Sequence, residues 1–204
     1  MKSGIVFSVL LSLLLSVPIF ARDYDEADME SFGRHAAMGE TDAIDKLDQA
    51  FTELTKGINY QTDMARAYTN AALMRIAFAK IADEVNGDDT NPAFQSLIYA
   101  TGKPNLAGFA AEAFGTAAAA GHAPSLDVLL NYKQHGILYS SAVLAMVPVA
   151  ATNNKAAVDF LVAVINSDKS KGLWLAASQG LTAAANDGNP DAKAALAKYA
   201  ASSN

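Results

Sequence analysis

Three histidines are the first side chains in this sequence that could do chemistry, because imidazole can carry a proton or bind a metal. They are His35, His122 and His135. None has a histidine, aspartate or glutamate three or four residues further on, and the H-E-x-x-H motif is absent. The spacing therefore predicts solvent-facing residues of turns and helix ends, not metal ligands or catalytic bases.

Carboxylates are concentrated in two runs of the sequence. The run over residues 83–89 has oxygens that could hold Ca²⁺, but it lacks the spaced D-x-D-x-D-G loop that ends in a bidentate glutamate. The run from Asp23 to Glu30 is mostly polar, whereas a catalytic carboxyl pair needs one member with a raised pKa in an apolar pocket. We interpret the first run as a solvated helix end and the second as a solvated lead-in.

Other motifs of catalysis are missing from the sequence. There is no Gly-x-Ser-x-Gly elbow and no phosphate-binding glycine loop, and the absence of cysteine excludes a thiol nucleophile. We therefore predict no catalytic residue, no metal and no cofactor, and a protein that is not an enzyme.

Aromatic side chains are the remaining candidates for a binding surface. Tyr99, Tyr132, Tyr139 and Trp174 could anchor a partner, since tyrosine and tryptophan are favoured at interfaces. Packing between helices is the alternative role for each of them, because amphipathic rings serve both purposes.

The first 21 residues have the layout of a secretory signal peptide. Lys2 provides a positive start, residues 4–17 are almost wholly apolar, and Pro18 ends the run before a small residue at Ala21. The alternative is an uncleaved membrane anchor, but the abruptly polar sequence from Arg22 onward favours cleavage near Ala21. We predict a single domain over residues 22–204.

The composition of the chain indicates which cellular compartment and which partners to expect. An exported chain without cysteine has no disulfides, and no Asn-x-Ser/Thr glycosylation site is present, which favours the periplasm or secretion from a bacterium. The net charge of −6 repels phosphate backbones, so nucleic acid is not an expected partner. Membrane contact is expected only through an uncleaved leader.

A spacing of residue types recurs along the sequence, and it indicates the helices that would position these side chains. A turn-favouring residue is followed four positions later by a small residue, and after four more by leucine. The pattern occurs at Gly39/Ala43/Leu47, Asp89/Ala93/Leu97, Gly121/Ser125/Leu129, Asn153/Ala157/Leu161 and Gly188/Ala192/Leu196. The small residue and the leucine lie on one face of a helix, so the pattern predicts that helical hairpins nest through this face.

Apolar periodicity predicts helices throughout and no β-strand. The expected helices cover about residues 25–38, 43–54, 61–85, 92–100, 106–120, 124–133, 140–151, 155–165, 173–186 and 190–201. Within the third helix, an apolar stripe from Met64 to Val85 is expected to face inward. Thr41 and Asn91 are expected N-caps, and Pro148 is expected to kink its helix or to start a shorter one.

The five pattern positions follow one another at intervals of 50, 32, 32 and 35 residues, and the last three intervals are close to the usual 34 or so of tetratricopeptide hairpins. Residues 118–125 with Leu129 resemble the signature of SEL-like repeats, relatives of the tetratricopeptide repeats, and residues 184–192 and 35–39 are similar. Residues 132–137 loosely resemble the loop in the middle of such a repeat. The resemblance covers residues 36–200 in outline and implies an α-solenoid of antiparallel hairpins that acts as a protein-binding adaptor without catalysis.

The chain departs from the SEL-like pattern at one position. That family places glycine directly after the leucine, where this sequence has Asp48, Ile98, Leu130, Val162 and Ala197. HEAT-like or other helical hairpins therefore stay open as alternatives.

The sequence leads to three hypotheses of function. The first is an exported, non-enzymatic α-solenoid that binds a protein or peptide in its groove. The second is a hydrolase of the cell envelope on a helical scaffold, which requires a deep pocket that gathers at least two polar residues. The third is a purely structural subunit of the envelope.

Overall fold

A computed structural model describes residues 24–132, 137–167 and 172–202. These residues form ten helices and no strand, which confirms the prediction of an all-α protein. The helices are α2 (Glu26–Ala37), α3 (Thr41–Thr55), α4 (Met64–Asp83), α5 (Pro92–Thr101), α6 (Ala107–Ala119), α7 (Ala123–Tyr132), α8 (Ile137–Ala151), α9 (Lys155–Ile165), α10 (Trp174–Asn186) and α11 (Pro190–Ser202). The predicted leader, residues 1–21, lies outside the described residues, as does His135.

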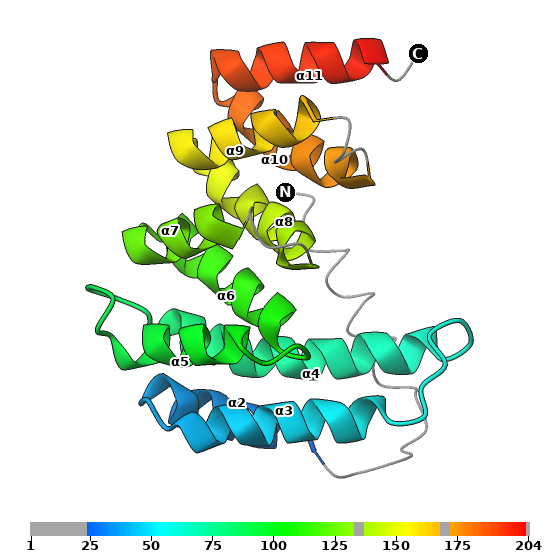
Figure 1. Ribbon diagram of the computed structural model, residues 1–204, viewed down its shortest axis with the longest axis vertical. Coiled ribbons are helices and arrows are strands. Elements are labelled where there is room, and N and C mark those ends of the chain that lie inside the picture. The colour runs from blue at the N-terminus through cyan, green and yellow to red at the C-terminus, as the bar shows by residue number, and fades with distance from the viewer. Residues whose placement is uncertain (1–23, 133–136, 168–171, 203–204) are drawn as a thin grey trace, which may run out of the picture.

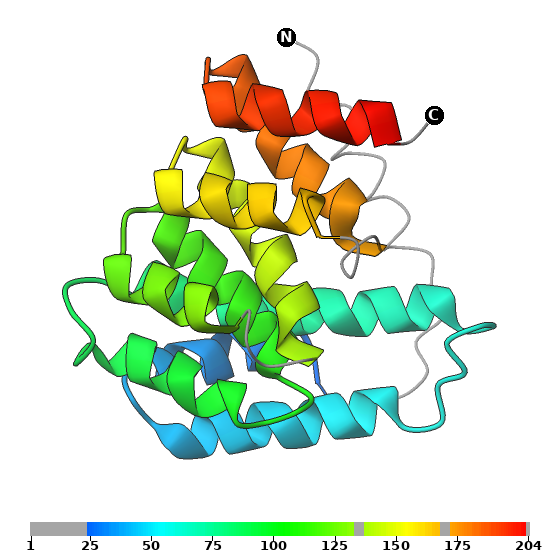
Figure 2. The ribbon, with the colours of Figure 1, turned by 45° about the horizontal axis from the view of Figure 1, so that its top comes forward.

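The helices are stacked along the long axis of the molecule, from α2 and α3 at one end to α10 and α11 at the other (Figure 1). Figure 2 shows the odd-numbered helices α3 to α11 in one layer and the even-numbered helices behind them. Within the second layer α2 contacts α4, α4 contacts α6, α6 contacts α8, and α8 contacts α10. Each even-numbered helix also contacts the odd-numbered helix that follows it, so the interior runs the length of the stack.

The repeated spacing found in the sequence forms this interior. All five small residues are buried, with exposures of 2% or less, and so are four of the five leucines; Leu196, in the last helix, is half-buried. Burying a leucine side chain contributes about 1.5–3 kcal/mol, so these positions are a main source of stability.

The turn residues of the pattern also have the expected backbone conformation at four of the five places. Gly39, Gly121 and Gly188 have φ angles of 89°, 102° and 96°, and Asn153 has a φ of 61°. This left-handed region favours glycine and, to a lesser degree, asparagine, because other side chains clash with the backbone there. Asp89 differs: in its connection Gly87 has the positive φ, of 71°.

Three helical glycines mark where even-numbered helices approach one another most closely. A Cβ atom on Gly33 would collide with the carbonyl oxygen of Ala77 in α4. One on Gly115 would lie 2.5 Å from the carbonyl oxygen of Ala145 in α8, and one on Gly180 would lie 3.1 Å from Cα of Val147. The spacing pattern did not reveal these contacts, because they join helices that are distant in the sequence.

Several local predictions are corrected by the structure. The inward-facing stripe in α4 begins near Met74, which is fully buried, whereas Met64 is 51% exposed because the first turns of α4 extend beyond the neighbouring helices. Thr41 is the first residue of α3 and not its N-cap; Glu40 occupies that position without a capping side-chain bond. Helix α8 begins at Ile137, three residues before the predicted start, and Pro148 lies inside it, so no shorter helix begins at this proline; the kink at Pro148 stays a prediction.

Other helix ends follow the predicted capping chemistry. The Asn91 side chain accepts a hydrogen bond from the backbone N–H of Phe94 and so caps α5, with Pro92 as the first helical residue. None of the helices in the described part of the chain is long and apolar enough to span a bilayer.

Candidate functional site

Three of the four predicted partner-binding aromatics lie within the packing between helices. Tyr132 is 8% exposed, and burial raises the pKa of its hydroxyl group. Tyr139 packs near Phe160 with ring centroids 6.0 Å apart. Trp174 is half-buried, and its indole N–H donates to the carbonyl oxygens of Val164 and Ser167. These three side chains fill space between elements and are not brought together on one surface.

Tyr99 is the exception, since 39% of it is exposed. Its hydroxyl group donates a hydrogen bond of 3.1 Å to Asp45 Oδ1, and Lys103 Nζ lies 5.1 Å from the centre of its ring. Lys103 Nζ is also 2.7 Å from Asp45 Oδ1, and this bond, followed by that from Tyr99, lowers the pKa of the Asp45 carboxyl. The two charged groups hold the tyrosine ring in one orientation at the surface.

Two other large apolar side chains of this region are exposed. Met38, at the end of α2, is 62% exposed, and Ile98 in α5 is 37% exposed. Met38 lines two adjoining hollows, and Ile98 and Tyr99 line the second of them together with Met38. We call the residues lining the two hollows the Met38 surface.

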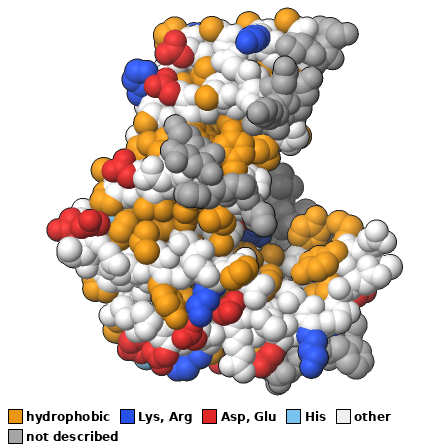
Figure 3. Space-filling model, in the orientation of Figure 1, with side chains coloured by type: hydrophobic (Ala, Val, Ile, Leu, Met, Phe, Trp, Pro, Cys, Tyr) orange, Lys and Arg blue, Asp and Glu red, His pale blue; other side chains and the backbone are white. Residues whose placement is uncertain are grey.

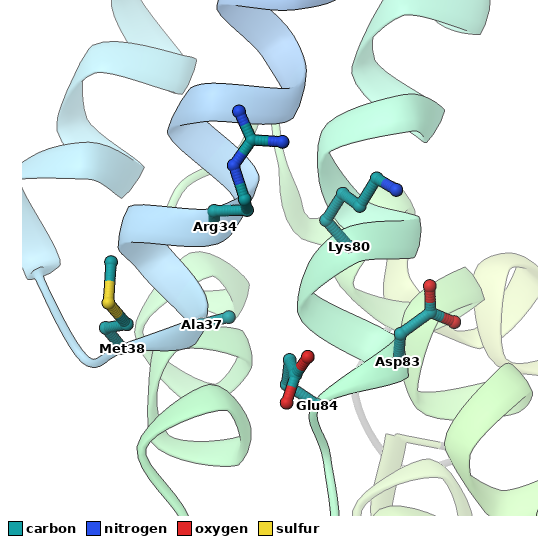
Figure 4. A pocket seen from close by; sticks show the side chains of 6 residues that line it. All are labelled: Arg34, Ala37, Met38, Lys80, Asp83 and Glu84. Atoms are coloured by element: carbon teal, nitrogen blue, oxygen red, sulfur yellow. The ribbon is translucent and has the colours of Figure 1, made fainter.

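The first hollow has a volume of about 470 Å³ and lies between the ends of α2 and α4. In Figure 4, Arg34 extends from α2, and Lys80 and Asp83 extend from α4, while Met38 and Glu84 directly follow these two helices. Arg34 forms an ion pair with Glu30 in its own helix, at 3.1 Å. Among the described residues, the carboxylates of Asp83 and Glu84 have no ion-pair partner, so they are available to a ligand.

The second hollow, of about 540 Å³, lies between the α2–α3 turn and α5. Its lining is mostly apolar or uncharged: Met38, Gly39, Thr41, Pro92, Gln95, Ser96, Ile98 and Tyr99. Its floor is fixed by the buried Ser96 hydroxyl group, which donates to the carbonyl oxygen of Ala36 across 2.6 Å. The second hollow therefore offers a mostly uncharged binding surface whose buried side is held in place by a hydrogen bond.

Sequence reasoning missed Met38 and Ile98 because neither carries chemistry; Met38 directly follows α2, and Ile98 lies within α5. A signal did exist for Ile98, which occupies one of the positions where SEL-like repeats have glycine. Met38 is the C-cap residue of α2 and directly precedes the left-handed Gly39.

Two further surface features lie apart from the Met38 surface. Tyr60, Met64 and Tyr68, at four-residue spacing, are each more than half exposed. Hydrophobic side chains accordingly gather at the right of Figure 3, over the beginning of α4.

A small hollow of about 170 Å³ lies between α4 and α6. It is lined in part by Arg75 and Glu112, which form a bidentate ion pair with N–O distances of 2.7 and 2.9 Å.

The described histidines divide between the surface and the interior. His35 is at the surface, as predicted, and its Nδ1 lies 3.0 Å from Glu40 Oε2. The prediction for His122 is wrong on exposure, since only 8% of it is accessible. Its Nδ1 accepts the backbone N–H of Ser125 and lies 2.8 Å from that residue's hydroxyl oxygen, so His122 caps α7 from a buried position against Phe94.

The carboxylate runs do not form a metal site in the part of the chain that the structure describes, where no group of three histidine, aspartate or glutamate side chains is arranged to hold an ion. Asp88 instead accepts hydrogen bonds from the backbone N–H and hydroxyl group of Thr90, which lower its pKa. Asp25 and Asp28 form a reciprocal capping box at the start of α2.

Comparison with models of protein families, with curated proteins and with solved structures found no match. The function must therefore be argued from the all-helical fold and from the Met38 surface.

Proposed function

We propose that this protein is an exported, non-enzymatic helical-repeat protein that binds a protein or peptide at its Met38 surface. The observation that carries the proposal is the exposure of Met38, Ile98 and Tyr99 around two adjoining hollows. Exposed apolar side chains framed by polar groups are characteristic of protein–protein contact sites.

The repeat architecture is part of the proposal. An α-solenoid of antiparallel hairpins, of the SEL-like, tetratricopeptide or HEAT-like kind, is supported by the buried small residues and leucines that recur along the chain. It is also supported by the succession of contacts between even-numbered helices. Such stacks present continuous surfaces built from several helices, which suits an extended ligand.

The chemistry of the surface favours binding over hydrolysis. The two hollows are open to solvent, and their lining residues do not pair a serine or threonine hydroxyl group with a histidine. The one buried hydroxyl group in the lining, that of Ser96, donates to a backbone carbonyl. Export to the periplasm or to the outside of the cell is proposed from the leader sequence alone.

Site-specific photo-crosslinking in the producing cells tests the proposal. A photoreactive amino acid is placed at Met38, at Ile98 or, as a control, at Leu144, which is 53% exposed in α8. We expect one protein to be captured from the first two positions and not from the third. Capture from none of them, or equally from all three, would refute binding at this surface.

The identified partner then allows a quantitative measurement. We expect Met38→Ala to weaken its affinity by at least tenfold, because a central interface side chain contributes about 2 kcal/mol or more. Leu144→Ala serves as the matched control and should leave the affinity unchanged.

A further inference from the structure

The negative charge of this protein is not spread evenly along the chain. Residues 24–57, which contain α2 and α3, have nine carboxylates and three cationic side chains, a net charge of −6. The rest of the sequence has twelve of each, so the first two described helices account for the whole net charge. Figure 3 shows acidic side chains, with some basic ones among them, over this end of the molecule.

Around the Met38 surface, too, described carboxylates without an ion pair outnumber such cations. The cations of the region are largely neutralised, since Arg34, Lys46 and Lys103 are each in an ion pair within the protein. Within the described ranges Lys80 has no ion-pair partner.

Carboxylates on the α4–α5 side are not neutralised in this way. Asp83 and Glu84 line the first hollow, and Asp88 and Asp89 follow in the connection that leads to α5. None of the four forms an ion pair with a described side chain, and all four are exposed. The connection lies next to the second hollow, because the Gln95 amide that helps to line it donates to the carbonyl oxygen of Asp89.

Apolar and acidic features thus meet at one place. Met38 has an unbranched, adaptable side chain that is well suited to contact ligands of varied shape. Tyr99 beside it is held by Asp45 and Lys103, so little conformational entropy is lost when it contacts a ligand. An apolar group bound here would have next to it four carboxylates without an ion pair and one such cation, Lys80.

We infer that the occupant of the Met38 surface is a cationic peptide segment that inserts one bulky apolar side chain beside Met38, Ile98 and Tyr99. This inference rests on the proposed function and specifies its partner. A second copy of this chain is a poorer fit, because a symmetric contact would bring the same unpaired carboxylates of the two copies together. Complementary charge is expected to speed association and to make the affinity depend on salt.

Three short synthetic peptides of equal length are the probes. The first is rich in lysine and arginine with one central leucine, the second replaces that leucine with alanine, and the third replaces the basic residues with glutamate. Binding to protein expressed from the full sequence is measured by fluorescence anisotropy, and the binding site is mapped by backbone amide NMR shifts.

We expect the first peptide to bind at least about tenfold more tightly than either of the others. Its shift changes should be concentrated at the Met38 surface, and its affinity should fall several-fold between low salt and about 0.3 M salt. Met38→Ala should weaken binding about tenfold, and Asp83→Asn with Glu84→Gln should weaken it about three- to tenfold.

Matched variants control for net charge and folding. Asp127→Asn with Asp187→Asn removes the same charge from exposed positions in and after other helices and should leave the affinity unchanged. Each variant's helical CD spectrum shows that it is folded.

The inference is overturned if the glutamate peptide binds as tightly as the basic one, if the shifts lie elsewhere, or if the two charge variants behave alike. It is also overturned if no peptide binds. In each of these cases a protein crosslinked at Met38 would still support the proposed function, so the two failures can be told apart.

Discussion

The close approach of α6 and α8 makes a quantitative prediction about Gly115. In Gly115→Ala the new Cβ would lie 2.5 Å from the carbonyl oxygen of Ala145 and 3.1 Å from its Cα. These are backbone atoms of a packed helix and cannot turn aside as a side chain could. The two helices must therefore separate or shift against each other.

Two effects of opposite sign decide the outcome. Overpacking in a protein interior costs about 1–3 kcal/mol. Alanine inside a helix is about 0.5–1 kcal/mol more favourable than glycine. Because the contact is with backbone, we expect the steric cost to exceed the gain, with a net loss of about 1–2 kcal/mol. For a chain of this size that lowers Tm by about 2–8 °C.

The same substitution in the same helix provides the control. At Gly108 an added Cβ would have only the Ser141 hydroxyl oxygen nearby, at an ordinary contact distance of 3.6 Å. Gly108→Ala should therefore leave Tm unchanged or raise it. Thermal and urea unfolding followed by far-UV circular dichroism measure both variants. A Gly115→Ala protein as stable as the Gly108→Ala protein would refute the close α6–α8 contact.

Four further predictions concern single residues, each checked by the same unfolding measurements. Asn91→Ala should cost about 1 kcal/mol, because the side chain caps α5; an unchanged Tm would contradict that role. Gly121→Ala should cost about 1 kcal/mol or more, since its φ is 102°, and an equally stable variant would contradict the left-handed turn. The Tyr132 hydroxyl oxygen is buried and, apart from a weak interaction with the Thr101 side chain, has no hydrogen-bond partner in the described structure, so Tyr132→Phe should be neutral or stabilising; a clear loss of stability would show that this interaction matters. The pKa of Asp45 is held below 3.8 by Lys103 first and then by the Tyr99 hydroxyl group. The stabilisation by this carboxylate is therefore present above pH 3.8 and is lost as the pH falls through the lower folded-state pKa. Asp45→Asn should lower Tm at neutral pH, with the difference from wild type disappearing in acid; a difference that does not change with pH would contradict the ion pair.

Helix positions followed closely from the sequence, and the reason is local. The predicted helix over residues 155–165 agrees with α9 at both ends, and Asn154 caps it through the backbone N–H of Ala157. Turn residues, caps and apolar spacing act over a few neighbouring residues, so they can be read without knowing the rest of the fold.

Predictions of exposure were less successful, because exposure depends on which helices lie next to one another. Met64 continues the apolar spacing of α4 but is half exposed, since no described helix covers the first turns of α4. His122 was expected in solvent because it lies in a turn, and yet the ring of Phe94, from a different helix, packs against it.

The candidate site also combines a residue that could be predicted locally with residues that only the packing of helices brings together. Tyr99 was chosen from residue type, and the structure places it at the rim of a hollow. Met38, Ile98, Asp83 and Glu84 could not have been grouped with it, since they come from α2, α4 and α5 and meet only through packing.

The sequence by itself determined that the chain is helical, where most helices begin and end, and which small residues and leucines face inward. It could do so because each of these features depends on the chemistry of residues within one or two helical turns. The tertiary structure alone decided how closely the even-numbered helices approach at Gly33, Gly115 and Gly180, which apolar side chains remain exposed, and where the carboxylates of separate helices come together. Those outcomes depend on contacts between residues that are far apart in the chain, which no local pattern encodes.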